Sequence, residues 1–241
     1  ILDAGGNVLR KIKSREIETK HSVSEGTFFE DRLLKSFSMK WNEFPYRIRY
    51  SFRSKKRNFL NLARWSPVLH PAVPVIKAYL NVEVPVDKAV RILSSGNISQ
   101  TTSNTGNSMV YKWEAFMTGP IEKECHQVPF EELIPFVWVV PERFSYIEEG
   151  SFSTWKAFGN WAGRITDGLD RLTPEEAVKA HQLVAGIENE LEKVKLLYDY
   201  FKENTRYINI TLAEGGMLPR PATFVCRNKF GDCKALSVYM K

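Results

Sequence analysis

The segment Gly231-Asp232-Cys233 has the residue types of a cysteine nucleophile at the start of a helix. A thiolate rather than a thiol attacks carbonyl groups, and a helix N-terminus or a nearby cation stabilises the thiolate. Gly231 allows a sharp turn, Asp232 can cap the helix, and Cys233 then lies in the first helical turn. The backbone N–H of Cys233 would lie near its own sulfur, where an oxyanion could be held. This arrangement suits acyl transfer.

A second interpretation of the same tripeptide is a structural cysteine buried at the start of a core helix. Lys229 and Lys234 lie close in sequence and could add a weaker electrostatic contribution to a reactive thiolate. The tripeptide alone favours the structural interpretation, so the choice depends on the surrounding sequence.

The other two cysteines are weaker candidates. Cys226 follows Val225 in an apolar run and is expected to be a small packed side chain. Cys125 precedes His126, but neighbouring residues of a strand point to opposite faces, so this pair is a poor catalytic candidate. Three cysteines without zinc-site spacing predict neither a disulfide framework nor a metal site, and no cofactor is expected.

The composition is that of an ordinary globular protein. The chain has 241 residues, 43% of them hydrophobic and 26% charged, which is enough for one large domain or two modest ones. No apolar stretch approaches the roughly 20 residues of a membrane-spanning helix. The net charge is +6, and its densest cluster, around residues 53–57, is expected to be a solvated turn. Nucleic-acid binding is therefore not expected.

The first part of the chain has the pattern of an antiparallel β-sandwich. Apolar and polar residues alternate in the ranges 12–19, 46–52, 73–84 and 108–116, which predicts strands with one buried face. The polar Ser/Thr/Asn run 98–107 is expected to be a turn.

Helical patterns replace strand patterns near residue 150. Helical spacing is found over 155–169 and 183–201, with a break near Gly186, and Thr173-Pro174-Glu175-Glu176 is typical of a helix start. An extended segment is expected at 207–210, an irregular loop at 215–221, and a helix from Cys233 to Met240. We therefore predict two domains, a β-sandwich over 1–150 and a helical part over 151–241.

The order of motifs near the end of the chain resembles bacterial transglutaminase-like proteins. The stretch 195–210 is similar to the helix and strand that precede the nucleophile in that family. The family's further motifs follow in order as Glu214-Gly215-Gly216, Pro219-Arg220-Pro221-Ala222 and Gly231-Asp232-Cys233-Lys234. This resemblance favours Cys233 as a catalytic nucleophile over a structural cysteine.

The upstream sequence resembles a domain of unknown function that commonly precedes this module in Gram-negative bacteria, especially Bacteroides-like ones. The motifs that carry the resemblance are Asp3-Ala4-Gly5-Gly6-Asn7-Val8, Phe44-Pro45-Tyr46-Arg47-Ile48-Arg49-Tyr50, Val84-Pro85, Tyr111-Lys112-Trp113 and Phe152-Ser153-Thr154-Trp155. The two resemblances together imply an α+β fold, with an N-terminal antiparallel β-sandwich followed by the helical N-terminal part of a papain-like core.

The family resemblance also implies what accompanies the nucleophile. Its catalytic order is Cys, then His, then Asp, whereas His21, His70, His126 and His181 all precede Cys233. His181 is expected to be a surface or packing residue of a helix. The chain is therefore expected to be cut off after the nucleophile, without its base and acid, and to be inactive by itself.

The activity that the resemblance implies is attack on a peptide or amide carbonyl through a thioester at Cys233. Better-known transglutaminases have Gln before and Trp after the nucleophile, where this chain has Asp232 and Lys234. That difference makes a protease or amidase activity at least as compatible as crosslinking. The substrate would be a polypeptide or amide, and the resemblance implies export to the periplasm or cell surface.

Two non-catalytic interpretations stay open. In one, the chain is a protein- or glycan-binding module on a transglutaminase-like scaffold, so the sequence does not decide whether it is an enzyme. In the other, exposed aromatic side chains such as Trp138 or Trp155 bind carbohydrate. Both tryptophans lie in apolar periodic runs, however, and are expected in the core, as is Trp161.

Overall fold

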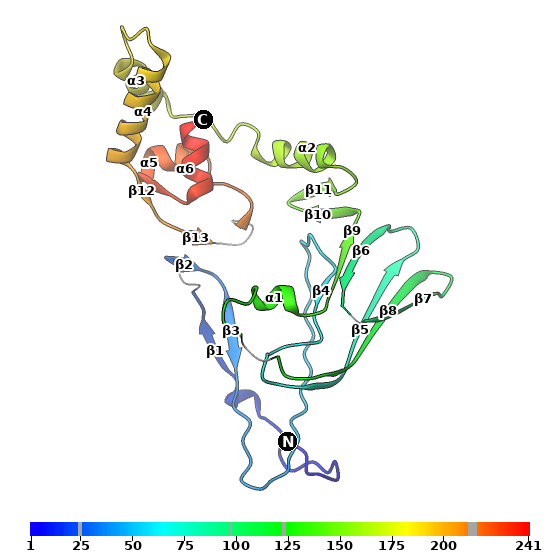
Figure 1. The fold of residues 1–241 in the computed structure, drawn as a ribbon. Coiled ribbons are helices and arrows are strands. Elements are labelled where there is room, and N and C mark those ends of the chain that lie inside the picture. The colour runs from blue at the N-terminus through cyan, green and yellow to red at the C-terminus, as the bar shows by residue number, and fades with distance from the viewer. Residues whose placement is uncertain (24–25, 97, 122–123, 212–215) are drawn as a thin grey trace. The chain divides into compact units, whose positions relative to one another are not determined.

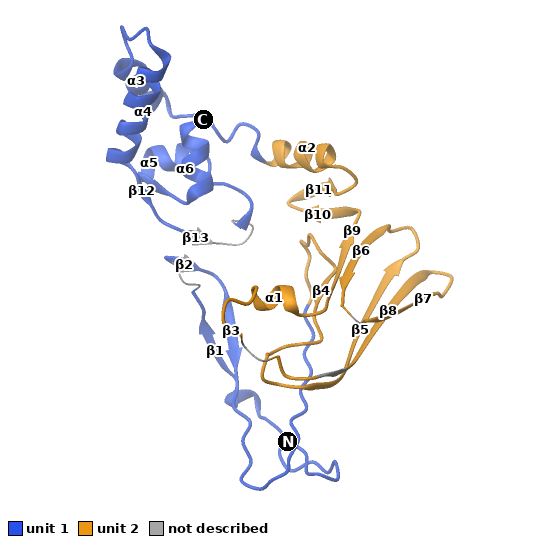
Figure 2. Ribbon diagram, in the orientation of Figure 1, with its two compact units in different colours: residues 1–54, 166–241 blue, residues 55–165 orange. Residues whose placement is uncertain are grey.

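The computed structural model describes residues 1–23, 26–96, 98–121, 124–211 and 216–241 (Figure 1). The described residues form antiparallel sheets and six α-helices, so the predicted α+β class is confirmed. The chain forms two compact units, one of residues 1–54 with 166–241 and one of residues 55–165 (Figure 2). The domain boundary near residue 150 stays a prediction.

Two three-stranded antiparallel sheets make up the centre of unit 55–165. One has the order β4-β9-β6 and the other β5-β8-β7. The strands are β4 (Ala63–Trp65), β5 (Val75–Pro85), β6 (Val90–Ser95), β7 (Ser99–Asn104), β8 (Ser108–Thr118) and β9 (Phe136–Pro141). Trp113 of β8 packs with Val137 and Val139 of β9, so side chains of the two sheets share one core.

Strand β9 shows why one of the expected core residues is outside. Val137 and Val139 are fully buried, and Trp138 between them points to the other face because strand side chains alternate. Trp138 is 37% exposed, and the Arg64 guanidinium lies 4.9 Å from the centroid of its ring. The expectation that Trp138 belongs to the core is therefore wrong.

Strand β7 corrects another expectation. The polar run 98–107 is not a turn throughout, because Ser99–Asn104 pairs with β8. All six side chains are exposed, so an edge strand of Ser and Thr has no apolar alternation that sequence patterning could detect. The turn itself covers only 105–107, where Gly106 has a φ of 91° and the N–H of Thr105 donates to the carbonyl of Ser108.

The rest of this unit consists of short α1 (Phe130–Leu133), the hairpin β10 (Arg143–Tyr146) and β11 (Glu148–Ser151), and α2 (Trp155–Thr166). Trp161 of α2 is fully buried, as predicted, and meets Phe144 edge-on with ring centroids 5.0 Å apart. Trp155 is 89% exposed, so the expectation that it lies in the core is wrong. It begins α2, where its ring meets that of Phe158 edge-on with centroids 6.5 Å apart and otherwise faces solvent.

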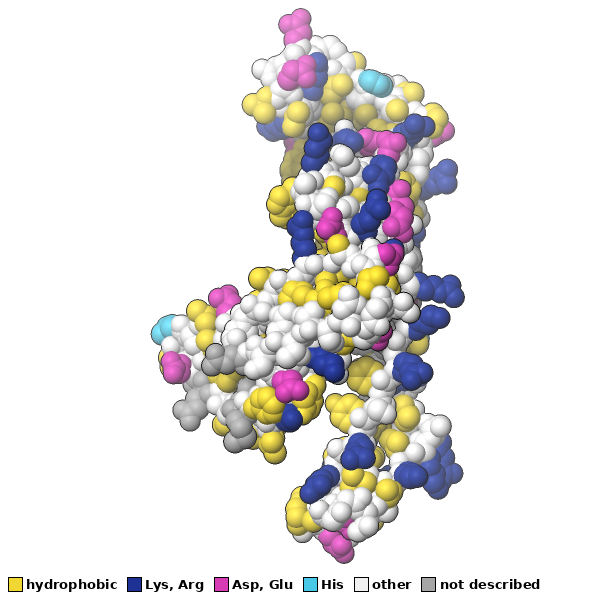
Figure 3. All heavy atoms as spheres, turned by 90° about the vertical axis from the view of Figure 1, so that its right-hand side faces the viewer, with side chains coloured by type: hydrophobic (Ala, Val, Ile, Leu, Met, Phe, Trp, Pro, Cys, Tyr) yellow, Lys and Arg dark blue, Asp and Glu magenta, His cyan; other side chains and the backbone are white. Residues whose placement is uncertain are grey.

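The N-terminal part of the other unit has little regular structure. It contains the short helix η1 (Ser14–Glu16) and the strands β1 (Glu18–His21), β2 (Phe29–Glu30) and β3 (Leu33–Ser36), with β1 antiparallel to β3. The strand expected at 46–52 is absent apart from a single bridge between Leu2 and Arg47. Phe52 is 85% exposed, so the alternating pattern has no core to face. Hydrophobic side chains are visible at several places on the face shown in Figure 3.

The remaining elements of this unit position Cys233. They are α3 (Pro174–Leu183), α4 (Glu190–Asn204), β12 (Arg206–Tyr207), β13 (Ile210–Thr211), α5 (Ala222–Asn228), β14 (Phe230–Gly231) and α6 (Cys233–Met240). The predicted helix start at Thr173 is confirmed, since its hydroxyl accepts from the N–H of Glu176 at 3.3 Å. The predicted break at Gly186, with a φ of 77°, separates α3 from α4.

Helices α5 and α6 pack against each other around a small apolar core. Ala222, Val225 and Ala235 are fully buried in it, and Phe201 of α4 packs from outside. Cys226 is also buried there, which confirms the expected packing role. The sequence pattern did not predict α5, because its seven residues are too short for a helical period to be recognised.

Candidate nucleophile site at the start of helix α6

Helix α6 begins at Cys233, as the sequence predicts, and Asp232 caps it. Asp232 has extended backbone angles, and its Oδ1 accepts from the N–H of Ala235 at 2.9 Å. This capping carboxylate is buried, with 9% exposure, whereas Cys233 is exposed. The structure therefore places the thiol at the positive end of a capped helix and within reach of solvent.

The two lysines near Cys233 are held by carboxylates. The Lys234 ammonium pairs with Oδ2 of Asp232, and the Lys229 ammonium pairs with Glu176 at 2.7 Å. Both cations are therefore partly neutralised, which leaves the helix N-terminus as the main electrostatic contribution to a thiolate.

Gly231 is required for a different reason from the one that the sequence suggested. Its backbone is not left-handed, but a Cβ at this position would lie 2.9 Å from Cβ of Ala235 and 3.4 Å from Cγ2 of Val225. The first turn of α6 packs directly on Gly231, so the missing side chain lets the helix approach. The position of Cys233 depends on this close approach.

A stretch of extended chain beside the site is bonded on two sides. β12 pairs parallel to β14, with the N–H of Arg206 donating to Lys229 and the N–H of Ile208 donating to Gly231. One residue further, the carbonyl of Asn209 accepts from the N–H of Phe28 at 2.8 Å, and β13 pairs parallel to β2. The N-terminal segment and the Cys233 segment are thus bonded to consecutive residues of one stretch. Nothing in the sequence pattern predicts this pairing between distant segments.

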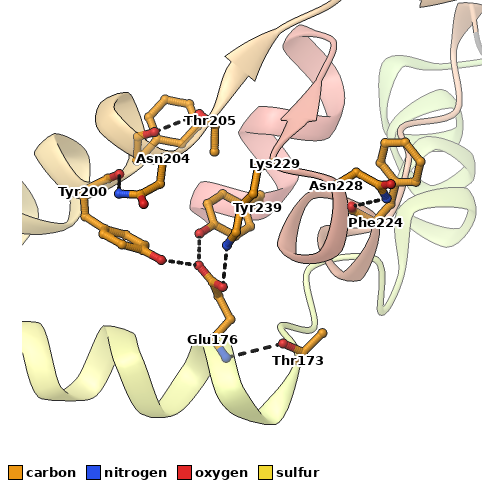
Figure 4. A network of polar contacts seen from close by, with 10 residues as sticks. Thr173, Glu176, Tyr200, Asn204, Thr205, Phe224, Asn228, Lys229 and Tyr239 are labelled. Atoms are coloured by element: carbon orange, nitrogen blue, oxygen red, sulfur yellow. Dashed lines mark hydrogen bonds and ion pairs between the residues drawn. The ribbon is translucent and has the colours of Figure 1, made fainter.

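A buried carboxylate, Glu176 of α3, lies at the centre of a polar network that reaches α4 and α6 (Figure 4). It accepts from the hydroxyl of Tyr200 at 2.9 Å, from the Lys229 ammonium at 2.7 Å, and from the hydroxyl of Tyr239. These donors come from α4, from the residue after α5, and from α6. The sequence pattern places Glu176 only at a helix start, and it contains no signal for the partners of this carboxylate.

The network shifts the titration of its members. Burial raises the pKa of Glu176, but the hydrogen bonds from Lys229, Tyr239 and Tyr200 outweigh it and hold that pKa below its usual value. Burial lowers the pKa of Lys229, and the bond to Glu176 raises it above the ordinary lysine value. Burial and the Glu176 carboxylate both raise the pKa of Tyr239 far above that of a free phenol. The Glu176 carboxylate is therefore ionised at neutral pH, and the Tyr239 hydroxyl stays protonated.

The remaining candidate residues lie elsewhere. Cys125 and His126 form a turn rather than a strand, both are exposed, and His126 has a φ of 61°. His181 is exposed on α3, as predicted. Among the described residues, no histidine is hydrogen-bonded to Cys233, and no cluster of His, Cys, Asp and Glu is arranged to hold a metal ion. Within the same residues, no helix is long and apolar enough to cross a membrane.

The fold and the Cys233 segment together describe an α+β chain with a capped, exposed thiol. Residues 1–122 match the family described as a Domain of Unknown Function with solved-structure structure (DUF3857), and the chain belongs to this family. The resemblance of the upstream sequence to a domain of unknown function is consistent with this membership. The transglutaminase-like part stays a prediction.

Two further comparisons give little beyond the family. No curated protein matches the chain. A crystal structure of a "putative protease" from Parabacteroides distasonis is 17% identical, with a TM-score of 0.48 over 73% of this chain and 32% of that chain. The chain thus spans about a third of the length of that protein.

Proposed function

We propose that this chain carries the nucleophile of a cysteine-dependent hydrolase or acyl transferase that acts on a peptide or amide. Cys233 is the nucleophile. The observation that supports this assignment is the exposed thiol at the first residue of α6, whose N-terminus is capped by the buried Asp232 carboxylate.

The first step is attack of the Cys233 thiolate on a carbonyl carbon, which forms a tetrahedral oxyanion. Asp232 accepts from the N–H of Ala235, and its carbonyl accepts from the N–H of Leu236. In the part of the chain that the structure describes, no acceptor is found for the N–H groups of Cys233 and Lys234. These two groups lie at the start of the helix and are proposed to hold the oxyanion.

The intermediate then collapses to a thioester. The C–N bond of the substrate breaks, the amine leaves with a proton from a general acid, and the acyl group stays on sulfur. Water or a second amine attacks the thioester and regenerates the thiolate. A His and an Asp that follow the nucleophile in the transglutaminase-like family are proposed to supply the proton transfers. Residues 1–241 are accordingly expected not to turn over amides by themselves, and an exported location is proposed on the same resemblance.

Thiol alkylation tests the proposal, and the chain contains its own control. Cys125 is also an exposed free thiol, but it lies in a turn rather than at a helix N-terminus. Iodoacetamide is added below neutral pH, and the modification of each cysteine is followed by peptide mass spectrometry. Cys233 is expected to react faster than Cys125, because only its thiolate is stabilised by a helix N-terminus. Equal rates, or slower reaction of Cys233, would overturn the proposal and favour a non-catalytic binding module.

A further inference from the structure

The geometry points to Glu176 as the positioning residue that holds Cys233 at its reactive position. This inference rests on the proposed function of Cys233. Glu176 does not touch the reacting atoms in the proposed mechanism; it acts through the segment that bears the thiol.

One carboxylate holds both ends of the segment that carries Cys233. Lys229 precedes Cys233 by four residues and donates to Oε2 of Glu176 at 2.7 Å. Tyr239 follows Cys233 by six residues, and its hydroxyl donates to Oε1 of the same side chain. Between these two contacts lie β14, the cap Asp232 and most of α6, so one side chain bonds the segment on both sides of Cys233.

The carboxylate is itself held in place. It lies in the first turn of α3, where Thr173 caps the helix, and Tyr200 of α4 donates to Oε1 at 2.9 Å. Glu176 is only 8% exposed, and its contact with Tyr239 is buried, so that bond is stronger than on a surface; the Lys229 side chain is 40% exposed. Helices α3 and α4 thus act as the frame against which the Cys233 segment is placed.

Apolar packing alone would leave this placement less well defined. The core of Ala222, Val225, Ala235 and Leu236 holds α6 against α5, but apolar contacts are non-directional. The three donors to Glu176 have defined directions, and they come from both sides of Cys233 as well as from α4. The network therefore determines the rotation of α6 relative to α3 and α4, and with it the direction of the thiol.

The substitution Glu176→Gln tests this role with little change in volume. The amide is neutral, so the bond to Lys229 loses its ionic character, and an NH₂ group facing Tyr200 and Tyr239 can bond them only with donor and acceptor reversed. Glu175→Gln is the matched control, because Glu175 is the neighbouring residue on α3 and is exposed. Tyr239→Phe is the second variant, since it removes only the hydroxyl that joins α6 to the carboxylate.

Alkylation of Cys233 is compared with that of Cys125 in each folded variant, and the melting temperature is recorded alongside. We expect the substitutions Glu176→Gln and Tyr239→Phe to lower the alkylation rate of Cys233 roughly ten-fold. This factor corresponds to the loss of one hydrogen bond to a charged group. The alkylation rate of Cys125 is expected to be the same in every variant, and the Glu175→Gln variant is expected to keep the wild-type rate at Cys233. If the Glu176→Gln variant does not fold, the alkylation rate of Cys233 in the Tyr239→Phe variant decides whether the network positions the thiol.

Two failures can be told apart. If wild-type Cys233 reacts faster than Cys125 but is unaffected in the variants while the melting temperature falls, Glu176 is merely structural and the inference is overturned. If wild-type Cys233 reacts no faster than Cys125, the proposed function is overturned, and the role of Glu176 with it.

Discussion

At the scale of single residues, the chemistry depends on three side-chain properties around Cys233. The thiol is exposed, the cap Asp232 is buried, and Gly231 leaves room for the helix. The start of α6 at Cys233 and its cap Asp232 could be inferred from sequence, because a helix start has a local signature. The Glu176 network could not, because it joins residues up to 63 positions apart that share no local pattern.

Substitution Gly231→Ala should destabilise the site-bearing unit by about 1–3 kcal/mol, because the new Cβ would overlap the first turn of α6. The measurement is the free energy of unfolding in urea. Gly159→Ala in α2 is the control: nothing lies within 4 Å of a Cβ there, and alanine favours the helix. An equal change in the free energy of unfolding of the two variants would show that α6 does not pack on Gly231 as described.

The Glu176 network predicts how stability depends on pH. The pKa of Glu176 is below its unfolded value of 4.5, so its contribution is fully present above pH 4.5 and is lost as the pH falls below it. The wild type should therefore melt at a higher temperature than Glu176→Gln at neutral pH, and the difference should shrink on acidification below that value. A difference that stays constant down to the acid limit would argue against an ionised, hydrogen-bonded Glu176.

At the scale of elements, local capping and strand alternation were the predictable part of the fold. The helices at Thr173 and Cys233 begin where their caps indicate, and the strand at 108–116 is observed within β8. The failures have tertiary causes. Residues 46–52 alternate in the sequence but are not part of a sheet. The polar residues 99–104 form a strand because they pair with β8.

The capping role of Asp232 can be separated from its effect on Cys233. Asp232→Ala and Asn189→Ala each remove a cap that accepts from helical N–H groups, so each should lower stability by about 1 kcal/mol. Only Asp232→Ala should also change the alkylation rate of Cys233, since Asn189 caps α4. Thermal melting and the alkylation assay measure the two effects. An equal change in the alkylation rate of Cys233 in both variants would mean that the reactivity of the thiol depends on general stability and not on the cap.

At the scale of the whole chain, segments far apart in sequence contribute to the unit that contains Cys233. Residues 1–54 and 166–241 form one compact unit, and the parallel pairing of β2 with β13 links them. This link could not be predicted from sequence, because two-residue strands have no periodicity and their partner is remote. Residues 1–54 of the family segment therefore belong to the same compact unit as Cys233.

Hydrogen exchange should reveal this link. The N–H of Phe28 donates to the carbonyl of Asn209, so it is expected to exchange more slowly than the N–H groups of 48–52, which form no strand. Phe28, Tyr50 and Phe52 all have exposed aromatic side chains, which makes the two segments comparable. Equally fast exchange in the two segments would rule out a stable pairing of the N-terminal segment with the stretch beside Cys233.

The central claim, that Cys233 forms a thioester, is tested most directly by acylation with an activated ester. A p-nitrophenyl ester needs no general acid, because nitrophenolate leaves unaided, so residues 1–241 suffice. The account predicts one acyl group per chain at Cys233, released by hydroxylamine and absent in Cys233→Ser, with Cys125 unmodified. Intact-protein and peptide mass spectrometry measure it. Equal acylation of Cys125 and Cys233, or no acylation of Cys233, would contradict the account.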